Sequence, residues 1–519
     1  MQFLLNLPLL SDHILTTIIF LPILCAVLIL IFLRDARQIR WFSLFITVVD
    51  FILATLLVSG FDRTTHQMQY VERYLWIPRL NAQYYLGVDG ISVTFVFLTT
   101  LIGWISVLAS WTAIDKKVRE FTISLLVLQT AMLGVFSAVD VALFFIFWEL
   151  MFVPMYVLIA IWGGLNRIYA TIKFFVYSYI GSVFMLVGVV SLYKMGGTFD
   201  MQALMGQSYP FPFQAFAFVL FFIAFSIKVP MFPFHTWLPA AHVEAPTAGS
   251  IILAGVLLKT GAYGFLRFLL PMFPDATRFF STPVIVLSII AIIYGAFLAL
   301  AQEDMKRLVA YSSVSHMGFI TFGLFLLNKN GIQGGILQMF NHGITTGALF
   351  LCVGIIYERT HTRDLSNYGW AARRVPFYAV FLLIFTLASL GFPGTNGFIG
   401  ELLILIGAYE RYRLYILFLI TGIILGASYM LWMYKRMSFG AGDGHHDEGH
   451  HGEGHEHGGM GHGIIKDVNP REVVAILAFI VFVFWIGFQP MSFLNIMHES
   501  VNHLITQING HSVITMTGY

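Results

Sequence analysis

Residues 223–239 read IAFSIKVPMFPFHTWLP and place a lysine and three prolines in an otherwise largely apolar run. Lys228 stands two residues before Pro230, and proline removes a backbone hydrogen bond and clashes with the preceding turn. We therefore expect the helix over residues 213–235 to break beside Lys228. A charge at the centre of a membrane helix costs at least about 2.5–3.5 kcal/mol, so a lysine kept there needs a reason.

The composition indicates that apolar runs of this kind dominate the chain. Of the 519 residues, 58% are hydrophobic and 11% are charged, and the mean hydropathy is +0.81. A soluble domain has roughly 25% charged residues. This chain is too poor in charge to cover a water-facing surface, which excludes a sizeable soluble domain. Its net charge of +2 gives no basic surface that would favour nucleic acid as a partner.

Membrane-spanning helices need about 20 apolar residues each, and runs of that kind fill almost the whole sequence. The first run lacks the positive flank and the cleavage site of a signal peptide, so we expect it to be retained. The predicted fold class is all-α integral membrane, with about fourteen transmembrane helices. The runs lie near residues 14–33, 41–60, 91–113, 121–139, 141–161, 170–193, 213–235, 247–270, 282–301, 308–327, 334–356, 376–409, 412–437 and 472–490.

The run at 376–409 is too long for one simple span, and it contains Gly391-Phe392-Pro393-Gly394, so two half-helices are expected. Helices four to eight and nine to thirteen form two groups, and the broken helix is the fourth member of each. A unit with an odd number of helices that repeats in tandem must be inverted in the membrane, as in many transporters. The predicted parts are three N-terminal helices with an outer loop at 1–113, a first five-helix repeat at 121–270, a second at 282–437, a His-rich loop at 438–471, and a last helix with its tail at 472–519.

The Lys and Arg residues of the loops predict the orientation. With the N-terminus outside, the cytoplasmic loops hold eighteen of the 29 basic residues, Lys306 among them, and the outer loops hold nine, Arg267 among them. The other two, Lys228 and Lys259, lie inside the membrane. This two-to-one bias predicts that both termini face the outside.

Residues 443–462 read DGHHDEGHHGEGHEHGGMGH and contain seven histidines among glycines and acids. The segment has no apolar period, so we expect a disordered, solvated cytoplasmic loop between helices thirteen and fourteen. Weak metal binding is the alternative, because His-rich tracts can bind metals. Its candidate ligands are His445, His446, His450 and His451. No other metal site is expected.

Six ionisable residues are expected near mid-membrane. They are Glu149 in LFFIFWELMFVPMY, Lys228 in the stretch quoted above, Lys259 in AGVLLKTGAYG, His316 in VAYSSVSHMGF, His342 in LQMFNHGITTG and Glu401 in GFPGTNGFIGELLILIG. A Glu149–Lys228 pair could serve only to hold helices together, and a lone histidine such as His342 is often a packing residue. Hydrogen bonds between membrane helices contribute only about 0.6–2 kcal/mol, which does not offset six such desolvation penalties. The set therefore favours a proton relay.

Electrostatics permits such a relay. A unit charge about 4 Å away contributes about 4 kcal/mol at an effective dielectric near 20. Making or breaking one ion pair could thus switch the next lysine between holding and releasing its proton. Histidine passes protons near neutral pH, and the serines beside His316 could support bound water. Those serines are Ser312, Ser313 and Ser315.

Five long motifs resemble those of the antiporter-like subunits of NADH:quinone oxidoreductase, respiratory complex I. They are FWELMFVPMY at 147–156, FSIKVPMFPFHTWLPAAHVEAPTAGS at 225–250, LLKTGAYGFLRF at 257–268, EDMKRLVAYSSVSHMGF at 303–319 and GFPGTNGFIGE at 391–401. The resemblance spans roughly residues 20–490 and is closest to the subunit M branch. It implies fourteen helices in two inverted five-helix repeats, with helices seven and twelve broken.

The resemblance also implies roles for the buried residues. Glu149 and Lys228 match the family's coupled ion pair, and Lys259 matches its central lysine. His316 matches a linking histidine and Glu401 the exit-side residue of helix twelve. Sister subunits and sodium/proton antiporters tend to place a lysine at this last position, so the glutamate favours subunit M.

The function implied is that of a proton-translocating membrane subunit without a redox centre of its own. The resemblance implies that FMN, iron–sulfur clusters and quinone belong to partner subunits. Cys25 and Cys352 alone fall short of the about four thiolates that an iron–sulfur cluster takes. The expected partners are the other membrane subunits of complex I, above all the sister antiporter-like subunits, together with lipid in a bacterial inner membrane. Two alternatives remain: a subunit of a multisubunit sodium/proton antiporter, and a structural membrane scaffold without transport.

Overall fold

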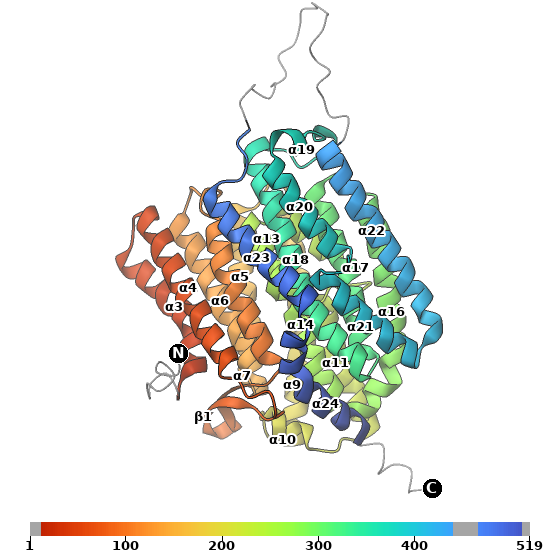
Figure 1. Ribbon diagram of the computed structural model, residues 1–519. Helices are drawn as coiled ribbons and strands as arrows, with labels where there is room; N and C mark the ends of the chain where they lie inside the picture. The colour runs from red at the N-terminus through yellow and green to blue at the C-terminus, as the bar shows by residue number, and fades with distance from the viewer. Residues whose placement is uncertain (1–11, 440–464, 511–519) are drawn as a thin grey trace, which may run out of the picture.

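The computed structural model describes residues 12–439 and 465–510 and shows an upright bundle of helices (Figure 1). Within these residues, 13 helices are long and apolar enough to cross a membrane. One further crossing is made by two half-helices, α20 (Pro376–Ser389) and α21 (Asn396–Arg411). The predicted all-α membrane fold with about fourteen spans is therefore confirmed. The His-rich segment at 443–462, with its four candidate metal ligands, lies outside the described residues.

The remaining crossings follow in chain order, and several consist of more than one helical segment. They are α3 (Ile14–Phe32), α4 (Ala36–Ser59), α5 (Ser92–Ala109), α6 (Val118–Ser137), α7 (Val141–Leu150) with α8 (Phe152–Trp162), α9 (Arg167–Gly196), α11 (Phe211–Lys228) with α12 (Trp237–Glu244), α13 (Thr247–Ile252) with α14 (Leu258–Gly264) and α15 (Leu270–Met272), α16 (Pro274–Leu300), α17 (Met305–Phe325), α18 (Lys329–Thr360), α22 (Ile416–Phe439) and α23 (Pro470–Phe488).

Both breaks predicted from the sequence are present. Helix α11 ends at Lys228 itself, and α12 begins only at Trp237. Between α20 and α21, Gly391 and Gly394 adopt φ values of +73° and +89°, a conformation that favours glycine. The π-helical segments η2 (Leu253–Leu257) and η3 (Phe265–Leu269) on either side of α14 were not predicted.

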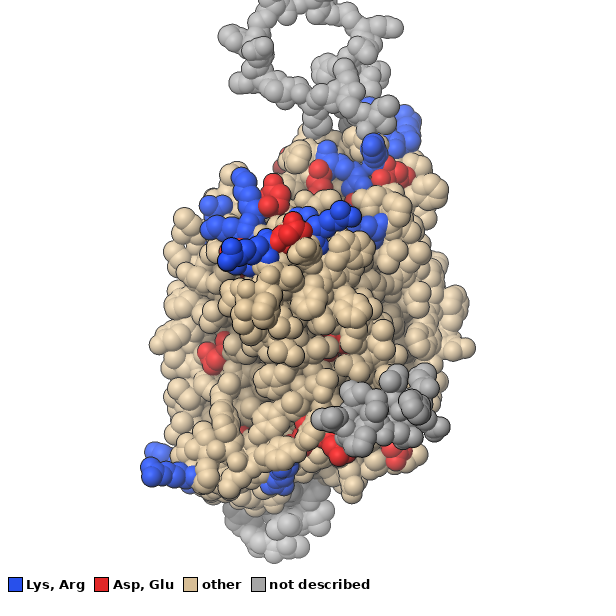
Figure 2. All heavy atoms as spheres, turned by 90° about the vertical axis from the view of Figure 1, so that its left-hand side faces the viewer, with Lys and Arg blue, Asp and Glu red and all other residues tan. Residues whose placement is uncertain are grey.

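The two ends of the bundle differ in structure and in charge. Strands β1 (Gln69–Ile77) and β2 (Ala82–Val88) pair antiparallel at the end where α3 begins, and we call this the hairpin end. Lys and Arg side chains gather at the opposite end, which we call the basic end, and the belt between the two ends shows none on the face in Figure 2. A belt free of basic residues is what contact with lipid requires.

Burial separates a central group of helices from a peripheral one. The apolar windows of the α13–α15 crossing and of α18 are 100% buried, whereas those of α9 and α22 are 28% buried. Since lipid-facing helices stay exposed in an isolated chain, the central helices are those that can hold groups away from lipid. Lys259 and His342 lie on these two fully buried crossings.

A paired geometry occurs once in each half of the chain. Asp140 and Asp200 form an isolated antiparallel bridge, and so do Asp304 and Asp364. Each pair is 60 residues apart, and all four carboxylates accept hydrogen bonds from backbone N–H groups of the segment that follows. Helix α10 (Met201–Met205), next to the first pair, lies at the hairpin end, and α19 (Ala371–Arg374), which follows the second, lies at the basic end (Figure 1). Equal spacing at opposite ends supports the inverted repeat predicted from the sequence.

A β hairpin and a C-terminal helix were not predicted either. The hairpin belongs to the stretch that was expected to be an outer loop, and its buried Glu72 accepts hydrogen bonds from the N–H groups of Leu15 and Thr16 at the start of α3. Helix α24 (Met491–Gly510) belongs to the expected tail. It is too polar to span a membrane, but it buries one face, formed by Phe493, Ile496, Met497, Val501, Leu504 and Ile508.

Candidate functional site

Lys259 lies at the centre of the molecule, on α14 between the two π-helical segments. Its side chain is fully buried, and its Nζ contacts only two hydrogen-bonding groups among the described residues, the carbonyl oxygen of Ala254 and Nδ1 of His342. The contact with His342 measures 2.7 Å. π-Helical turns are frequent at functional sites, and here one of them holds the carbonyl that accepts from the lysine.

His342 continues this contact toward the second repeat. Its ring centroid lies 5.8 Å from that of His316 on α17. Nδ1 of His316 lies 3.9 Å from a carboxylate oxygen of Glu401, and Nε2 lies 3.3 Å from the Ser389 hydroxyl. Four of the six predicted site residues thus form one buried chain, Lys259–His342–His316–Glu401.

A small polar cavity lies beside the two histidines. Its lining includes Gln338, Asn341, Thr345 and Ser389. Within the described residues, Oδ1 of Asn341 and Nε2 of His342 are buried and have no hydrogen-bond partner. Buried polar groups without partners are commonly satisfied by water, so this cavity has the chemistry of a water site.

The break between α20 and α21 provides space for Glu401. A Cβ atom added at Gly391 would lie 2.6 Å from a carboxylate oxygen of Glu401. Among the described residues, one hydrogen bond to the Glu401 carboxylate is present: the Gln338 amide donates to it at 3.4 Å. The glycine therefore has two reasons to stand at this position: its positive φ and the close approach of the carboxylate.

Glu149 and Lys228 form a separate site in the first repeat. Lys228 is buried, and its Nζ lies 5.2 Å from the centre of the Trp148 ring, within the range of a cation–π interaction. Among the described residues, Glu149 and Lys228 share no hydrogen bond and no ion pair within 4.0 Å, and one carboxylate oxygen of Glu149 is buried without a partner. The two groups are neighbours that interact electrostatically, but this structure does not close them into an ion pair.

The two sites are not joined by polar side chains. Lys228 packs through its Cβ against Gly261, where an added Cβ would lie 3.0 Å away. In the described part of the chain, no hydrogen bond or ion pair links Lys228 to Lys259. The structure thus brings together the four residues of the second site and leaves an apolar step between them and Lys228.

Two further buried residues belong near Lys259, although sequence reasoning did not select them. His242 on α12 is fully buried and stacks on Phe350 at 4.5 Å, and neither of its ring nitrogens has a hydrogen-bond partner among the described residues. It lies within electrostatic reach of both Lys259 and Lys306. The sequence placed Lys306 in a cytoplasmic loop, but it is a buried residue of α17 whose Nζ donates to the Ala245 carbonyl at 2.6 Å. The sequence signal for His242 that was missed is the motif AAHVEAP, which places this histidine two residues before the end of α12.

No set of metal ligands occurs in the described parts of the chain. Residues 12–439 and 465–510 contain no group of three or more His, Cys, Asp or Glu that could hold a metal ion. Cys25 and Cys352 are both free and buried.

Comparison with known proteins gives one consistent result. A family model described as NADH:quinone oxidoreductase/Mrp antiporter, TM matches residues 138–426. NADH-quinone oxidoreductase subunit M of Rhodobacter capsulatus is 43% identical, and the match covers 95% of this chain and 96% of that protein. NADH-ubiquinone oxidoreductase chain 4 of Marchantia polymorpha is 41% identical, with 95% and 97% covered.

Solved structures show the same fold. A chain of respiratory complex I from Thermus thermophilus superposes with a TM-score of 0.85 at 27% identity, covering 95% of this chain and 99% of that one. A chain of the Mrp complex from Dietzia sp. DQ12-45-1b gives a TM-score of 0.84 at 20% identity, covering 96% and 99%. The second likeness concerns the fold alone.

Fold and site together define an antiporter-like, multi-pass membrane protein with a buried chain of ionisable groups. The chain belongs to the NADH:quinone oxidoreductase/Mrp antiporter membrane family, and within that family to the subunit M group.

Replacing Gly391 by alanine tests whether the glycine positions Glu401. We expect a several-fold loss of proton transport, because the new methyl group must displace the carboxylate from His316. Gly394→Ala is the matched control, since Gly394 also has a positive φ but its nearest neighbour is a side chain 3.7 Å away. Equal activities of the two variants, measured as proton uptake by inverted membrane vesicles, would contradict a specific role for Gly391.

Proposed function

We propose that this chain translocates protons as subunit M of a membrane-bound NADH:quinone oxidoreductase, and that Lys259, His342, His316 and Glu401 carry them. The observation that carries this proposal is the buried chain itself. Lys259 and His342 are in hydrogen-bond contact, the two histidine rings are neighbours at 5.8 Å, and His316 lies 3.9 Å from Glu401; each group can take up and release a proton.

The first transfer is set by the bond between Lys259 and His342. As an ammonium, Lys259 donates to Nδ1 of the neutral histidine. If the proton crosses this 2.7 Å contact, the lysine becomes a neutral amine and the histidine an imidazolium with both nitrogens protonated. The Nε2 proton of His342 can then pass to the polar cavity, because that nitrogen has no protein partner among the described residues.

The later transfers use the second repeat. His316 faces the same cavity and lies 3.9 Å from Glu401, a separation that one water molecule or a small rotation bridges. Glu401 stands at the break of helix twelve, where the backbone is interrupted. Glu149 and Lys228 act earlier: opening or closing their contact changes the field at Lys259 and so the ease with which it gives up its proton.

His242 and Lys306 extend the same chain toward the basic end. His242 interacts electrostatically with both Lys306 and Lys259. Both of its ring nitrogens are available for hydrogen bonding, because neither has a partner among the described residues. We assign it to the supply of protons from that end.

The redox chemistry belongs to other subunits. This chain offers two single cysteines, and an iron–sulfur cluster takes about four. We therefore assign iron–sulfur clusters to partner subunits, and, from the similarity to complex I, FMN and quinone as well. The partners in the membrane are the other complex I subunits, above all the sister antiporter-like subunits. A sodium/proton antiporter subunit is the second candidate, supported by the fold of the Mrp chain but at the lower identity of 20%.

The orientation follows from the basic end. Lys and Arg concentrate there (Figure 2), and such residues remain on the cytoplasmic side of bacterial membranes. We place the hairpin end outside a bacterial inner membrane. Because α3 begins and α24 packs at the hairpin end, both termini are then outside.

Reporter insertions test this orientation. An enzyme that is active only outside the inner membrane should work when inserted at residue 81, in the turn of the hairpin, and should fail at residue 450. A cytoplasm-dependent fluorescent reporter should show the reverse pattern. Activity of the first reporter at residue 450 would invert the assignment.

Lys259→Ala tests the central carrier. The complex should assemble, but NADH:quinone activity and proton pumping should both fall at least about tenfold, because electrons and protons move together in a coupled machine. Lys259→Arg should be impaired too, because a guanidinium does not release its proton. The readouts are quinone reduction and vesicle acidification in the same membranes.

Lys329→Ala is the control, since Lys329 is a partly exposed residue at the start of α18 and lies outside the buried chain. An assembled Lys259→Ala complex with full activity and full pumping would refute the relay.

A further inference from the structure

A large cavity lies at the hairpin end, away from the relay. It has a volume of about 600 Å³, room for roughly twenty water molecules at about 30 Å³ each. Its walls come from the loop before β1, the junction of α6 and α7, α10, the outer half of the α13–α15 crossing, and α24. Three polar residues of its rim, His66, Gln202 and His503, are exposed, so solvent reaches the interior.

The floor of this cavity is a closed polar network. Arg267 pairs with Asp89 and donates to the hydroxyls of Ser92 at 2.7 Å and Tyr263 at 3.0 Å. Tyr263 in turn contacts Ser92 at 2.9 Å and donates to the Phe136 carbonyl at 3.1 Å. The sequence counted Arg267 among the outer loop residues, but it lies inside the fully buried crossing.

Asp89 remains ionised in this network. Burial raises the pKa of its carboxyl, but the Arg267 guanidinium and the hydrogen bonds from Ser92 outweigh that effect and lower the pKa overall. A permanent guanidinium and a carboxylate are thus fixed side by side at the bottom of a solvent-filled space.

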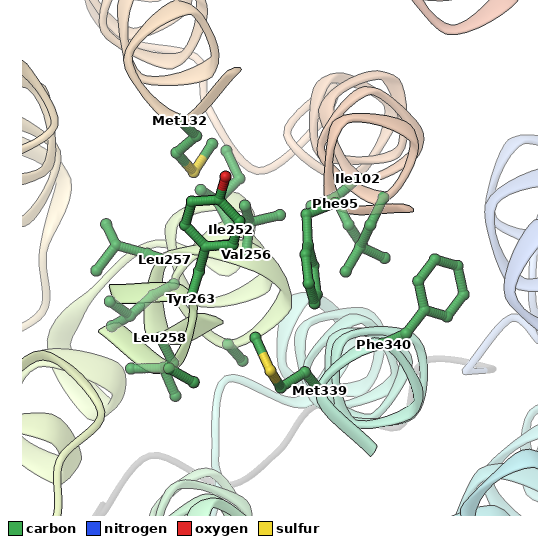
Figure 3. Close-up of a cluster of buried hydrophobic side chains, with 14 of the residues drawn as sticks. Phe95, Ile102, Met132, Ile252, Val256, Leu257, Leu258, Tyr263, Met339 and Phe340 are labelled. Carbon is green, nitrogen blue, oxygen red and sulfur yellow. The ribbon is translucent and has the colours of Figure 1, made fainter. Parts of the chain in front are cut away.

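Beneath this network the path toward Lys259 is apolar. Phe95, Phe136 and Tyr263 form a triangle, with ring centroids 5.1 to 6.3 Å apart, and all three are almost fully buried. Lys259 precedes Tyr263 by one helical turn, about 6 Å along the axis. Figure 3 shows apolar side chains packed around Tyr263 and Phe95, among them Met132, Val256 and Ile102.

We propose that Asp89, Arg267 and Tyr263, together with Phe95 and Phe136, form a seal that keeps the solvent of the hairpin-end cavity away from Lys259. This inference rests on the proposed function, because a seal matters only if Lys259 carries protons. Its role is to give the transport a direction: a proton on Lys259 leaves through His342 and Glu401 and does not escape by the short route outward.

Two physical barriers act in series in this seal. The guanidinium repels hydronium ions and cannot itself pass a proton on. Arginines exclude protons from some membrane pores in the same way. The aromatic triangle keeps water out, as hydrophobic constrictions of channels do. A merely structural ion pair would not need an apolar layer between itself and the relay.

The test is passive proton leak, measured without NADH in proteoliposomes that hold the purified complex and an imposed membrane potential. The first variant combines Arg267→Gln with Asp89→Asn, which removes both charges and leaves no unpaired buried ion. The second is Tyr263→Phe, which removes one hydroxyl and should assemble normally. We expect leak to rise about tenfold in the first and severalfold in the second, while electron transfer continues and is no longer stimulated by an uncoupler.

Arg359→Gln with Glu472→Gln is the matched control, because this partly buried pair lies at the basic end with a separation of 2.7 Å. It should leave the leak at the level of the unmodified complex. Adding Lys259→Ala to each leaky variant should abolish the extra leak, because the leak is then deprived of its carrier.

Normal leak in assembled Tyr263→Phe and in the double variant would overturn the seal. So would a leak that persists after Lys259→Ala, because it would bypass the relay. Failure of the proposed function gives a different result: Lys259→Ala alone would keep full proton pumping.

Discussion

The contact between Lys259 Nζ and His342 Nδ1 is the interaction on which the rest of the site depends. An ammonium with no access to water must find acceptors inside the protein, and here it has two, one of which is itself a base. Only one proton can lie between Lys259 Nζ and His342 Nδ1 in this hydrogen bond. Lys259 and His342 therefore cannot both be fully protonated without breaking it, and whichever group holds the charge makes the other a base.

The surrounding fold meets the requirements of this contact. The α13–α15 crossing and α18 are the two most buried crossings, so lipid does not reach either side chain. The π-helical segment η2 places the Ala254 carbonyl where Nζ can reach it. The broken helices bring irregular backbone to the same depth only inside the bundle, which is where a membrane protein tolerates it. The polar cavity beside His316 and the aromatic triangle of Phe95, Phe136 and Tyr263 then give the charge a polar environment on one side and an apolar one on the other.

Much of this organisation could be predicted from the sequence, because lipid imposes simple rules on composition. Fourteen apolar runs predicted the crossings, most of their ends to within about five residues, although α16 begins at Pro274, eight residues before its predicted run. Proline or glycine after Lys228 and before Glu401 marked both breaks. The β hairpin was missed because a short two-stranded ribbon at the membrane surface has no comparable length signal. Helix α24 was missed because its apolar face is interrupted by polar residues, which lowers its hydropathy below that of a span.

The site was predicted less completely, for reasons that lie in three dimensions. Lys259, His316, His342 and Glu401 come from four crossings, and the sequence could say that each was buried but not that they touch. The expected ion pair of Glu149 and Lys228 is not closed in this structure, because Lys228 lies over the Trp148 ring instead. His242 and Lys306 escaped notice since their burial arises from the half-helix α12 folding against α17. The neighbours of His242 and Lys306 in the sequence did not reveal this burial.

The central claim is that Lys259 and Glu401 act in series on one path. The most direct measurement is the number of protons pumped per NADH oxidised by Lys259→Ala, Glu401→Gln and the double variant in reconstituted complex. In a series path either change alone interrupts the flow, so the double variant should pump no less than the more impaired single variant. Losses in protons per NADH that add up in the double variant would show two independent routes and would contradict the account.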